Sequence, residues 1–188
     1  MADAQFYEVS PRRAEPFSAQ PERLLSEEQE AALLLGEWRP AEPLVLRHNS
    51  DRGPDSLGWG GSPALVIVSP EFCQALTDAG CTGWSTFAVV VLGEHDDRVV
   101  TAEHRGLVVL GRCGRIDYDR STPIPGSRTG RRGLFFDIDS WDGSDLFVPA
   151  GSARRIYTKK AVDALRSHRI PGLAYETTRD TTVYVRGR

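Results

Sequence analysis

The chain has 188 residues, of which 40% are hydrophobic and 26% are charged, and this ordinary globular composition excludes fibrous and fully disordered classes. A net charge of −3 argues against a dedicated nucleic-acid-binding protein. No run of residues approaches the roughly 20 apolar residues of a membrane helix, and the first residues lack the apolar stretch of a signal peptide. We therefore expect a cytoplasmic protein that binds neither nucleic acid nor a membrane.

Charge is distributed unevenly along the chain. Residues 1–110 carry 8 basic and 17 acidic side chains, a net −9, whereas residues 111–188 carry 15 basic and 9 acidic side chains, a net +6. We expect these acidic N-terminal and basic C-terminal halves to pack as one globular body. The asymmetry either separates two faces that dock or steer a charged partner, or it is scattered over a solvated surface.

The first predicted elements are a strand and a short helix. The strand covers 5–9, and the segment 10–21 is expected to be a loop because its three prolines oppose regular structure. Ser26 and Gln29 have the spacing of a capping box, which predicts a helix that begins there and ends at Gly36.

A short strand and a long loop are expected next. The strand covers 44–46, and the loop covers the glycine-rich segment 48–63. Trp59 lies within this loop, where it either fills a gap in the core or belongs to a contact surface.

An internal similarity at an offset of 89 residues is the most informative pattern. Residues 64–69 form an apolar run that ends in Ser69, a good N-cap residue, and a helical spacing of apolar residues follows. Adding 89 places Ser69 on Thr158. Helices are therefore expected over 70–79 and 159–168, each with a strand on either side. The sequence predicts two similar strand-helix-strand units and leaves open whether they are a true duplication.

The remaining predicted elements are strands. They cover 98–102 and 107–110, which are expected to form a hairpin, and also 133–139 and 181–185. Strands outnumber helices, and the helices alternate with strands too rarely for a doubly wound parallel sheet. The predicted class is α+β with a mostly antiparallel sheet.

Cysteines and histidines give no pattern of a metal site. Cys73, Cys81 and Cys113 cannot form a disulfide framework or a four-thiolate zinc site within one chain, so reduced and mostly buried thiols are expected. The four histidines have no metal-ligand spacing, and no cofactor is expected. Cys113 lies beside arginines that favour a thiolate, but the sequence shows no base for a nucleophilic mechanism.

Four carboxylates, Asp137, Asp139, Asp142 and Asp145, form what we call the acidic segment. Its start resembles the Asp-x-Asp of aspartate-nucleophile phosphatases, but only 51 residues follow Asp137, too few for that fold. The spacing excludes an EF-hand and leaves an irregular cation site open. Trp141 within this segment either packs inside a structural corner or anchors an interface together with Asp142 and Asp145.

Several segments of the C-terminal half resemble bacterial immunity proteins. These segments are Cys113–Arg115, Phe135–Asp137, Ser140–Phe147, Tyr157–Thr158, Ala164–Leu165 and Ile170–Glu176. Their order is similar to that of cysteine-poor relatives of the double-CxxCG-motif immunity proteins, and the resemblance covers residues 112–176. Residues 66–83 also resemble an earlier strand-helix segment of that family.

The resemblance implies a bacterial protein without catalytic activity that binds and neutralises a cognate polymorphic toxin by occlusion. Members with two CxxCG motifs are expected to bind zinc, but only Cys113–Gly114 remains here, so zinc is not expected. For such an inhibitor, Trp141, Asp142 and Asp145 on an exposed turn, and Trp59 on the long glycine-rich loop, are the expected partner-binding residues. The alternative is a small-ligand-binding or hydrolytic domain that uses the acidic segment.

Overall fold

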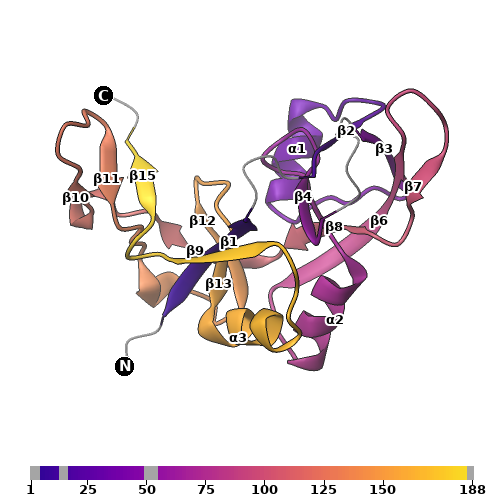
Figure 1. Ribbon diagram of the computed structural model, residues 1–188. Helices are drawn as coiled ribbons and strands as arrows, with labels where there is room; N and C mark the ends of the chain where they lie inside the picture. Colours follow the sequence, from indigo (N-terminus) through magenta and orange to yellow (C-terminus); the bar gives the residue numbers. More distant parts are fainter. Residues whose placement is uncertain (1–4, 13–16, 49–54, 186–188) are drawn as a thin grey trace.

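Two sheets lie side by side in the computed structural model, which describes residues 5–12, 17–48 and 55–185, and a small third sheet lies at one end (Figure 1). The first sheet has the order β14 (Leu173–Thr177), β1 (Phe6–Pro11), β13 (Ile156–Thr158), β12 (Leu146–Ala150) and β9 (Gly111–Arg115). We call it the five-stranded sheet. Its strands are antiparallel except for the parallel pair of β12 and β9.

The second sheet has seven strands. Its order is β2 (Ala19–Pro21), β3 (Leu44–His48), β6 (Trp84–Leu92), β8 (Arg105–Val109), β5 (Val66–Val68) and β4 (Leu57–Trp59), with β7 (Val99–Thr101) paired to β6. The third sheet has the order β10 (Thr122–Pro123), β11 (Gly130–Arg132) and β15 (Thr182–Tyr184). The three α-helices of the described residues are α1 (Glu27–Leu34), α2 (Pro70–Asp78) and α3 (Lys159–Ser167). The fold is therefore α+β and mostly antiparallel, as predicted.

Both predicted strand-helix-strand units are present. They are β5-α2-β6 and β13-α3-β14. Ser69 Oγ accepts a hydrogen bond from the N–H of Phe72, and Thr158 Oγ1 accepts one from the N–H of Ala161, so each residue caps its helix as expected. The capping box of Ser26 and α1 is also confirmed.

The two units match in strand register as well as in sequence order. Leu57 of β4 lies opposite Val68 of β5, and Leu146 of β12 lies opposite Tyr157 of β13. Both members of the second pair follow their counterparts by 89 residues. Because a strand pair can shift by any number of residues, an identical register shows that the units are structural repeats.

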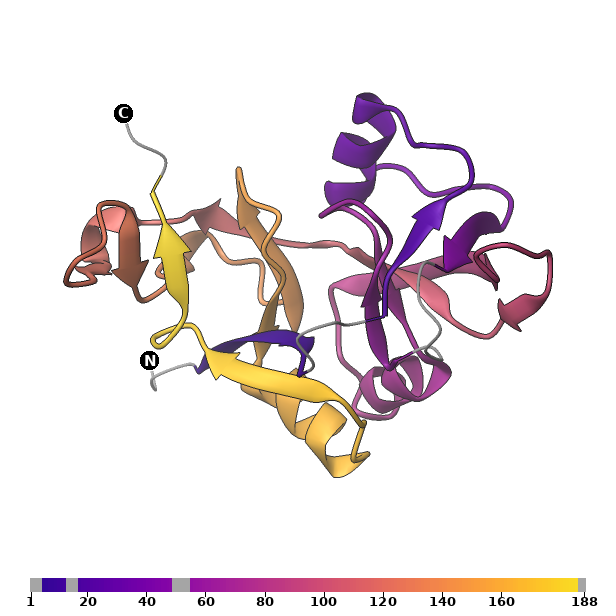
Figure 2. The ribbon, with the colours of Figure 1, turned by 45° about the horizontal axis from the view of Figure 1, so that its top comes forward.

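The repeats extend to a further strand that comes from a distant part of the chain. β8 lies between β5 and β6, and β1 lies between β13 and β14 (Figure 2). Phe87 faces Gly106 across β6 and β8, and Glu176, 89 residues after Phe87, faces Glu8 across β14 and β1. β1 therefore occupies in the five-stranded sheet the place that β8 occupies in the seven-stranded sheet.

Each of these strands continues into the opposite sheet. After β1 the chain reaches the seven-stranded sheet, where Ser18 forms a parallel bridge with Trp59. After β8 the chain reaches the five-stranded sheet, where Arg112 of β9 pairs in parallel with Val148 of β12. Trp59 and Val148 are again 89 residues apart. The two repeats have thus exchanged their first strands within one chain.

The largest apolar core belongs to both repeats. It contains Phe72 and Leu76 from α2, Val162 and Leu165 from α3, and Tyr7 from β1. The two helices lie next to each other below the sheets in Figure 1. The acidic half, residues 1–110, and the basic half, residues 111–188, therefore share one core, and the boundary between them falls where the chain crosses from β8 to β9.

Two segments expected to be loops contain strands. The segment 10–21 includes the end of β1 and all of β2, because Pro11 and Pro21 stand at the ends of these strands, where a missing N–H is tolerated. The segment 48–63 includes β4. Gly58 makes that strand possible, since a Cβ atom there would approach Phe17 Cδ1 to 2.4 Å.

Two other predictions are wrong. β7 and β8 do not form a hairpin with each other, because both pair with β6 at successive positions along that long strand. The predicted strand over 133–139 is mostly irregular. Phe136 makes an isolated bridge with Ile116, and a 3₁₀ turn over Ile138–Ser140 begins where the Asp137 side chain accepts a hydrogen bond from the N–H of Asp139.

Candidate functional site

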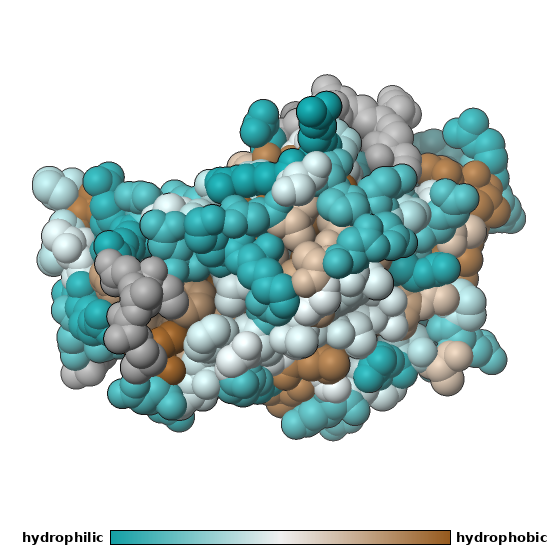
Figure 3. Space-filling view, turned by 90° about the horizontal axis from the view of Figure 1, so that it is seen from below, coloured by the Kyte–Doolittle hydropathy of each residue, from teal (hydrophilic) through white to brown (hydrophobic). Residues whose placement is uncertain are grey.

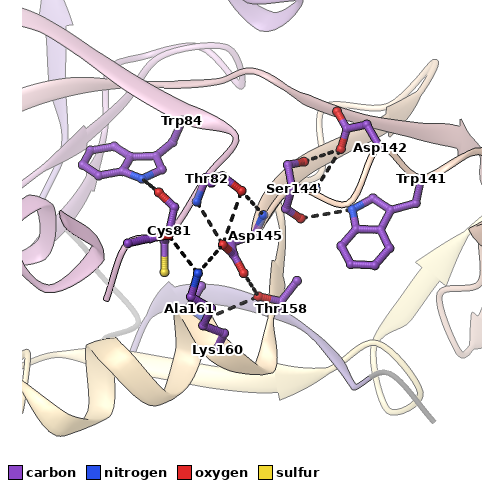
Figure 4. Close-up of polar contacts among 11 residues, drawn as sticks. Cys81, Thr82, Trp84, Trp141, Asp142, Ser144, Asp145, Thr158, Lys160 and Ala161 are labelled. Carbon is purple, nitrogen blue, oxygen red and sulfur yellow. Dashed lines mark hydrogen bonds and ion pairs between the residues drawn. The ribbon is translucent and has the colours of Figure 1, made fainter. Parts of the chain in front are cut away.

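The acidic segment folds into a tight corner between β9 and β12. The Asp142 carboxylate accepts a hydrogen bond from the N–H of Arg112 (2.8 Å). It also accepts from the N–H of Ser144 (3.0 Å) and from the Ser144 hydroxyl (Figure 4). Burial alone would raise the pKa of Asp142, but these hydrogen bonds and the charge of Arg112 hold the pKa below its ordinary value. Asp142 therefore holds the corner together.

Trp141 is a packed residue of this corner. Its ring lies edge-on to Phe6 with the centroids 5.4 Å apart, and its centroid is 5.7 Å from that of Phe147. Its Nε1–H donates to the carbonyl of Ser144 at 3.0 Å. With both its face and its N–H engaged, the half-buried Trp141 acts as a structural residue rather than a free aromatic anchor.

Asp145, expected on an exposed turn, is only 8% exposed and lies at the junction of the two repeats (Figure 4). Its carboxylate accepts hydrogen bonds from the N–H of Thr82 (2.9 Å), the hydroxyl of Thr158 (2.9 Å) and Nζ of Lys160 (3.0 Å). Burial opposes the charge, but these donors outweigh it and hold the pKa of Asp145 below its ordinary value. The expectation of exposure is corrected, because the carboxylate joins α3 to the segment before β6.

The described residues hold no group of three His, Cys, Asp or Glu side chains arranged to bind a metal ion. Within the acidic segment, Asp137 caps the 3₁₀ turn through the N–H of Asp139. Cys113 is buried, its thiol donates to the carbonyl of Asp137, and burial raises the pKa of the thiol. A raised pKa disfavours the thiolate, so Cys113 lacks the activation that a nucleophile requires.

A pocket of about 390 Å³ lies between the five-stranded sheet and the β4–β5 pair of the other sheet. It falls within the size range of sites that bind small molecules or single side chains. Its walls combine apolar and charged side chains. They are Glu8, Val9, Ser10, Leu57, Trp59, Pro63, Val66, Ala153, Arg154, Arg155, Tyr157 and Glu176.

Trp59 is the sequence-predicted residue that lines this pocket, whereas Trp141, Asp142 and Asp145 do not line it. Trp59 belongs to β4 and is 36% exposed, so its ring belongs to the pocket wall and to the surface at once. The structure therefore separates the four predicted partner-binding residues into one at the pocket and three in the corner.

The pocket also contains charged residues that the sequence analysis did not identify. Nη1 of Arg154 lies 2.6 Å from Oε2 of Glu8, and Glu8 faces Glu176 across the strand pair. Burial raises the pKa of Glu8, although the charge of Arg154 opposes the shift. The sequence signal for these residues is the pair of consecutive arginines at 154 and 155 directly before an apolar strand, but their hydrogen-bond partners lie far away in the chain.

Arg155 is held differently from Arg154. Its Nη2 donates to the carbonyls of Pro63 (2.9 Å) and Ala64 (2.8 Å), which belong to the turn between β4 and β5. Neutral carbonyls are its hydrogen-bond acceptors within the described part of the chain. Arg155 therefore links the two sheets at the pocket and brings a charge there that pairs with no carboxylate of the described residues.

None of the described helices is both long and apolar enough to cross a membrane. No protein-family model matches the chain, and no curated protein matches it significantly.

Proposed function

We propose that this chain is an immunity-type protein that binds a cognate bacterial toxin and neutralises it by occlusion, with the pocket beside Trp59 as its recognition site. The observation that carries the proposal is the position of Trp59, which stays 36% exposed while it lines a concave, charged pocket. Tryptophan is enriched among the residues that dominate binding energy, above all where it lies beside a pocket.

The surroundings of Trp59 support its use as an anchor. Its strand, β4, is fixed by β5 on one side and by the parallel bridge to Ser18 on the other. A rigid site loses little conformational entropy when a partner binds. The resemblance of residues 112–176 to immunity proteins favours a protein partner, and the unequal charge of the two halves favours a charged one.

The helix face is a weaker candidate for the same role. Seen from below, the face that carries α2 and α3 is mainly hydrophilic, with small separate hydrophobic areas (Figure 3). In this proposal the corner around Trp141 supports β12, which borders β13 in the same sheet, and the contacts of Asp142 and Asp145 are structural.

A small-molecule ligand is the second candidate function. It is favoured by the pocket volume of about 390 Å³, which suits a ligand with few heavy atoms. Saturable binding of such a ligand to the isolated protein, with no toxin bound under the same conditions, would select this function instead.

The test uses proteins encoded beside this gene as candidate partners. We expect one of them to co-purify with the chain and to lose its toxic activity on binding. Trp59→Ala should weaken that binding by at least about 2 kcal/mol, as truncation of an interface anchor does. Leu35→Ala is the matched control, because Leu35 is 50% exposed at the end of α1 and does not line the pocket. Full affinity of the Trp59 variant would contradict the proposed site.

A further inference from the structure

Arg155 is a pocket residue with hydrogen-bond donors that are not in use. Two backbone carbonyls accept hydrogen bonds from its Nη2, while Nε and Nη1 have no hydrogen-bond partner among residues 5–12, 17–48 and 55–185. Across the same ranges, the buried side-chain nitrogen and oxygen atoms that lack a hydrogen-bond partner are the hydroxyls of Ser85 and Ser121. Because Nε and Nη1 of Arg155 are not among them, these two nitrogens are in contact with solvent. Arg155 therefore presents free donors at the wall of the pocket.

The charge of Arg155 is also uncompensated. Arg154 pairs with Glu8, whereas no ion pair of the described residues includes Arg155. Burial lowers the pKa of its guanidinium. The phenolate of Tyr157 would oppose this shift, but Tyr157 is itself buried and its pKa is raised to about 12, so the side chain is uncharged near neutral pH. An arginine remains protonated in proteins, so the site holds a partly desolvated cation that lacks an anion.

The rest of the pocket defines what kind of anion fits. Leu57, Trp59 and Val66 provide an apolar wall beside the guanidinium. Glu8 is neutralised by Arg154, and Glu176 lies on β14, where its side chain is exposed. An anion attached to an apolar body would meet both the free donors and the apolar wall.

We infer that the pocket is a carboxylate-binding site in which Arg155 receives the carboxylate and Trp59 packs against the apolar group that carries it. Guanidinium and carboxylate match in geometry, since two parallel N–H groups bind two oxygens. In the complex, the occupant is an acidic side chain of the protein partner. This assignment of the occupant rests on the proposed function, whereas carboxylate binding by itself does not.

The experiment titrates the isolated protein with three probes of similar shape and different charge. They are 3-phenylpropionate, its neutral amide and 3-phenylpropylammonium, and binding is followed by the NMR shift of the Trp59 indole N–H. We expect saturable binding of the carboxylate and at least tenfold weaker binding of the amide. An amide or ammonium probe that binds as tightly as the carboxylate would overturn the inference.

Two variants separate the charge from the fold. Arg155→Gln keeps an N–H donor for the carbonyls of Pro63 and Ala64 but removes the charge, so the preference for carboxylate over amide should disappear. Glu176→Gln removes a neighbouring negative charge and should tighten carboxylate binding, a gain that a purely structural role of these residues does not produce. Arg166→Gln is the control. Arg166 lies over the rings of Tyr7 and Tyr175 and does not line the pocket, so this substitution should leave the preference for carboxylate unchanged.

Failure of the Arg155 variant to fold leaves the probe comparison in the wild-type protein as the deciding measurement. Competition then identifies the occupant. Displacement of the bound toxin by 3-phenylpropionate supports an acidic side chain of the partner in the pocket. Simultaneous binding of probe and toxin would overturn that assignment, and a carboxylate site without any toxin partner would contradict the proposed function alone.

Discussion

Gly80 and Arg169 occupy the same position at the ends of two equivalent helices, 89 residues apart, and both have left-handed backbones, with φ of 59° and 53°. The hydrogen bonds around them also match. The N–H of Cys81 donates to the carbonyl of Leu76 after α2, and the N–H of Ile170 donates to the carbonyl of Leu165 after α3. The second repeat thus makes with an arginine the turn that the first makes with a glycine.

Arg169→Gly should stabilise the protein. A side chain in the left-handed region costs about 1 to 2 kcal/mol, part of which is offset by the larger entropy that glycine loses on folding. We expect a net gain of about 0.5 to 1 kcal/mol in the free energy of unfolding, measured by denaturant titration.

Gly80→Ala is the converse experiment. A Cβ atom at Gly80 would have no heavy atom within 4 Å, so backbone strain is the main cost and a loss of about 1 kcal/mol is expected. A stabilising Gly80→Ala or a destabilising Arg169→Gly would show that the two turns are not energetically equivalent.

Asp145→Asn should cost about 2 to 3 kcal/mol near neutral pH, because the amide cannot satisfy the donors of Thr82, Thr158 and Lys160 together. The folded pKa of Asp145 is depressed, so its charge stabilises the fold above the unfolded pKa. This contribution is lost as the pH falls through the folded value. The difference between wild type and variant should therefore shrink in acid.

Asp163→Asn is the matched control for that measurement. Asp163 pairs with Lys159 on the exposed side of α3, and such surface pairs contribute about 0.5 kcal/mol or less. Equal losses from the two substitutions would contradict a structural role of Asp145 between the repeats.

Glu8→Gln tests the opposite pH dependence. Burial raises the folded pKa of Glu8 above its ordinary value, so the stabilising effect of its proton is complete below the unfolded pKa and is lost as the pH rises through the folded pKa. The glutamine keeps an oxygen for Arg154 without a charge that titrates. Wild type should therefore lose stability relative to the variant as the pH rises above 4.5, the ordinary pKa of a glutamate side chain. A difference that stays constant over this range would exclude the titration of Glu8 as its source.

Trp141→Ala should destabilise the fold by about 3 kcal/mol, because it removes the contacts with Phe6 and Phe147 and leaves a cavity in the corner. Affinity for a partner, measured per folded molecule, should stay unchanged. Trp59→Ala should show the reverse, a small change in melting temperature and a large loss of affinity. A Trp141 variant that keeps its stability but loses binding would show that the corner contacts the partner.

Local chemistry explains which elements were predictable. Ser26, Ser69 and Thr158 each specify a helix start through a side chain that acts within three residues, and the apolar runs beside them predict strands. The similarity at an offset of 89 residues identified both strand-helix-strand units. The equivalence of β1 and β8 was not apparent, because Glu8 and Gly106, which occupy matching positions in the two repeats, differ by 98 residues rather than 89 and share little side-chain chemistry.

The site was predictable only in part. Trp59 was identified as a large aromatic in an unusual glycine-rich context, although its strand was not. Asp145 looked exposed because acidic residues beside Asp142-Gly143 usually belong to surface turns, and its burial depends on donors from Thr82, 63 positions earlier. Arg155 gained significance only from carbonyls 91 and 92 residues away in the chain. Such long-range pairings follow from strand order, which local patterns do not determine.

The exchange of first strands has a consequence for how the protein is made. During synthesis β1 leaves the ribosome before the strands on either side of it, β13 and β14, which end at Thr158 and Thr177. The apolar side chains of Tyr7 and Val9 therefore lack these neighbours until β13 and β14 have been made, while the seven-stranded sheet has all its members once Val109 has emerged. The five-stranded sheet is therefore completed after the seven-stranded sheet, around a strand that was made before either.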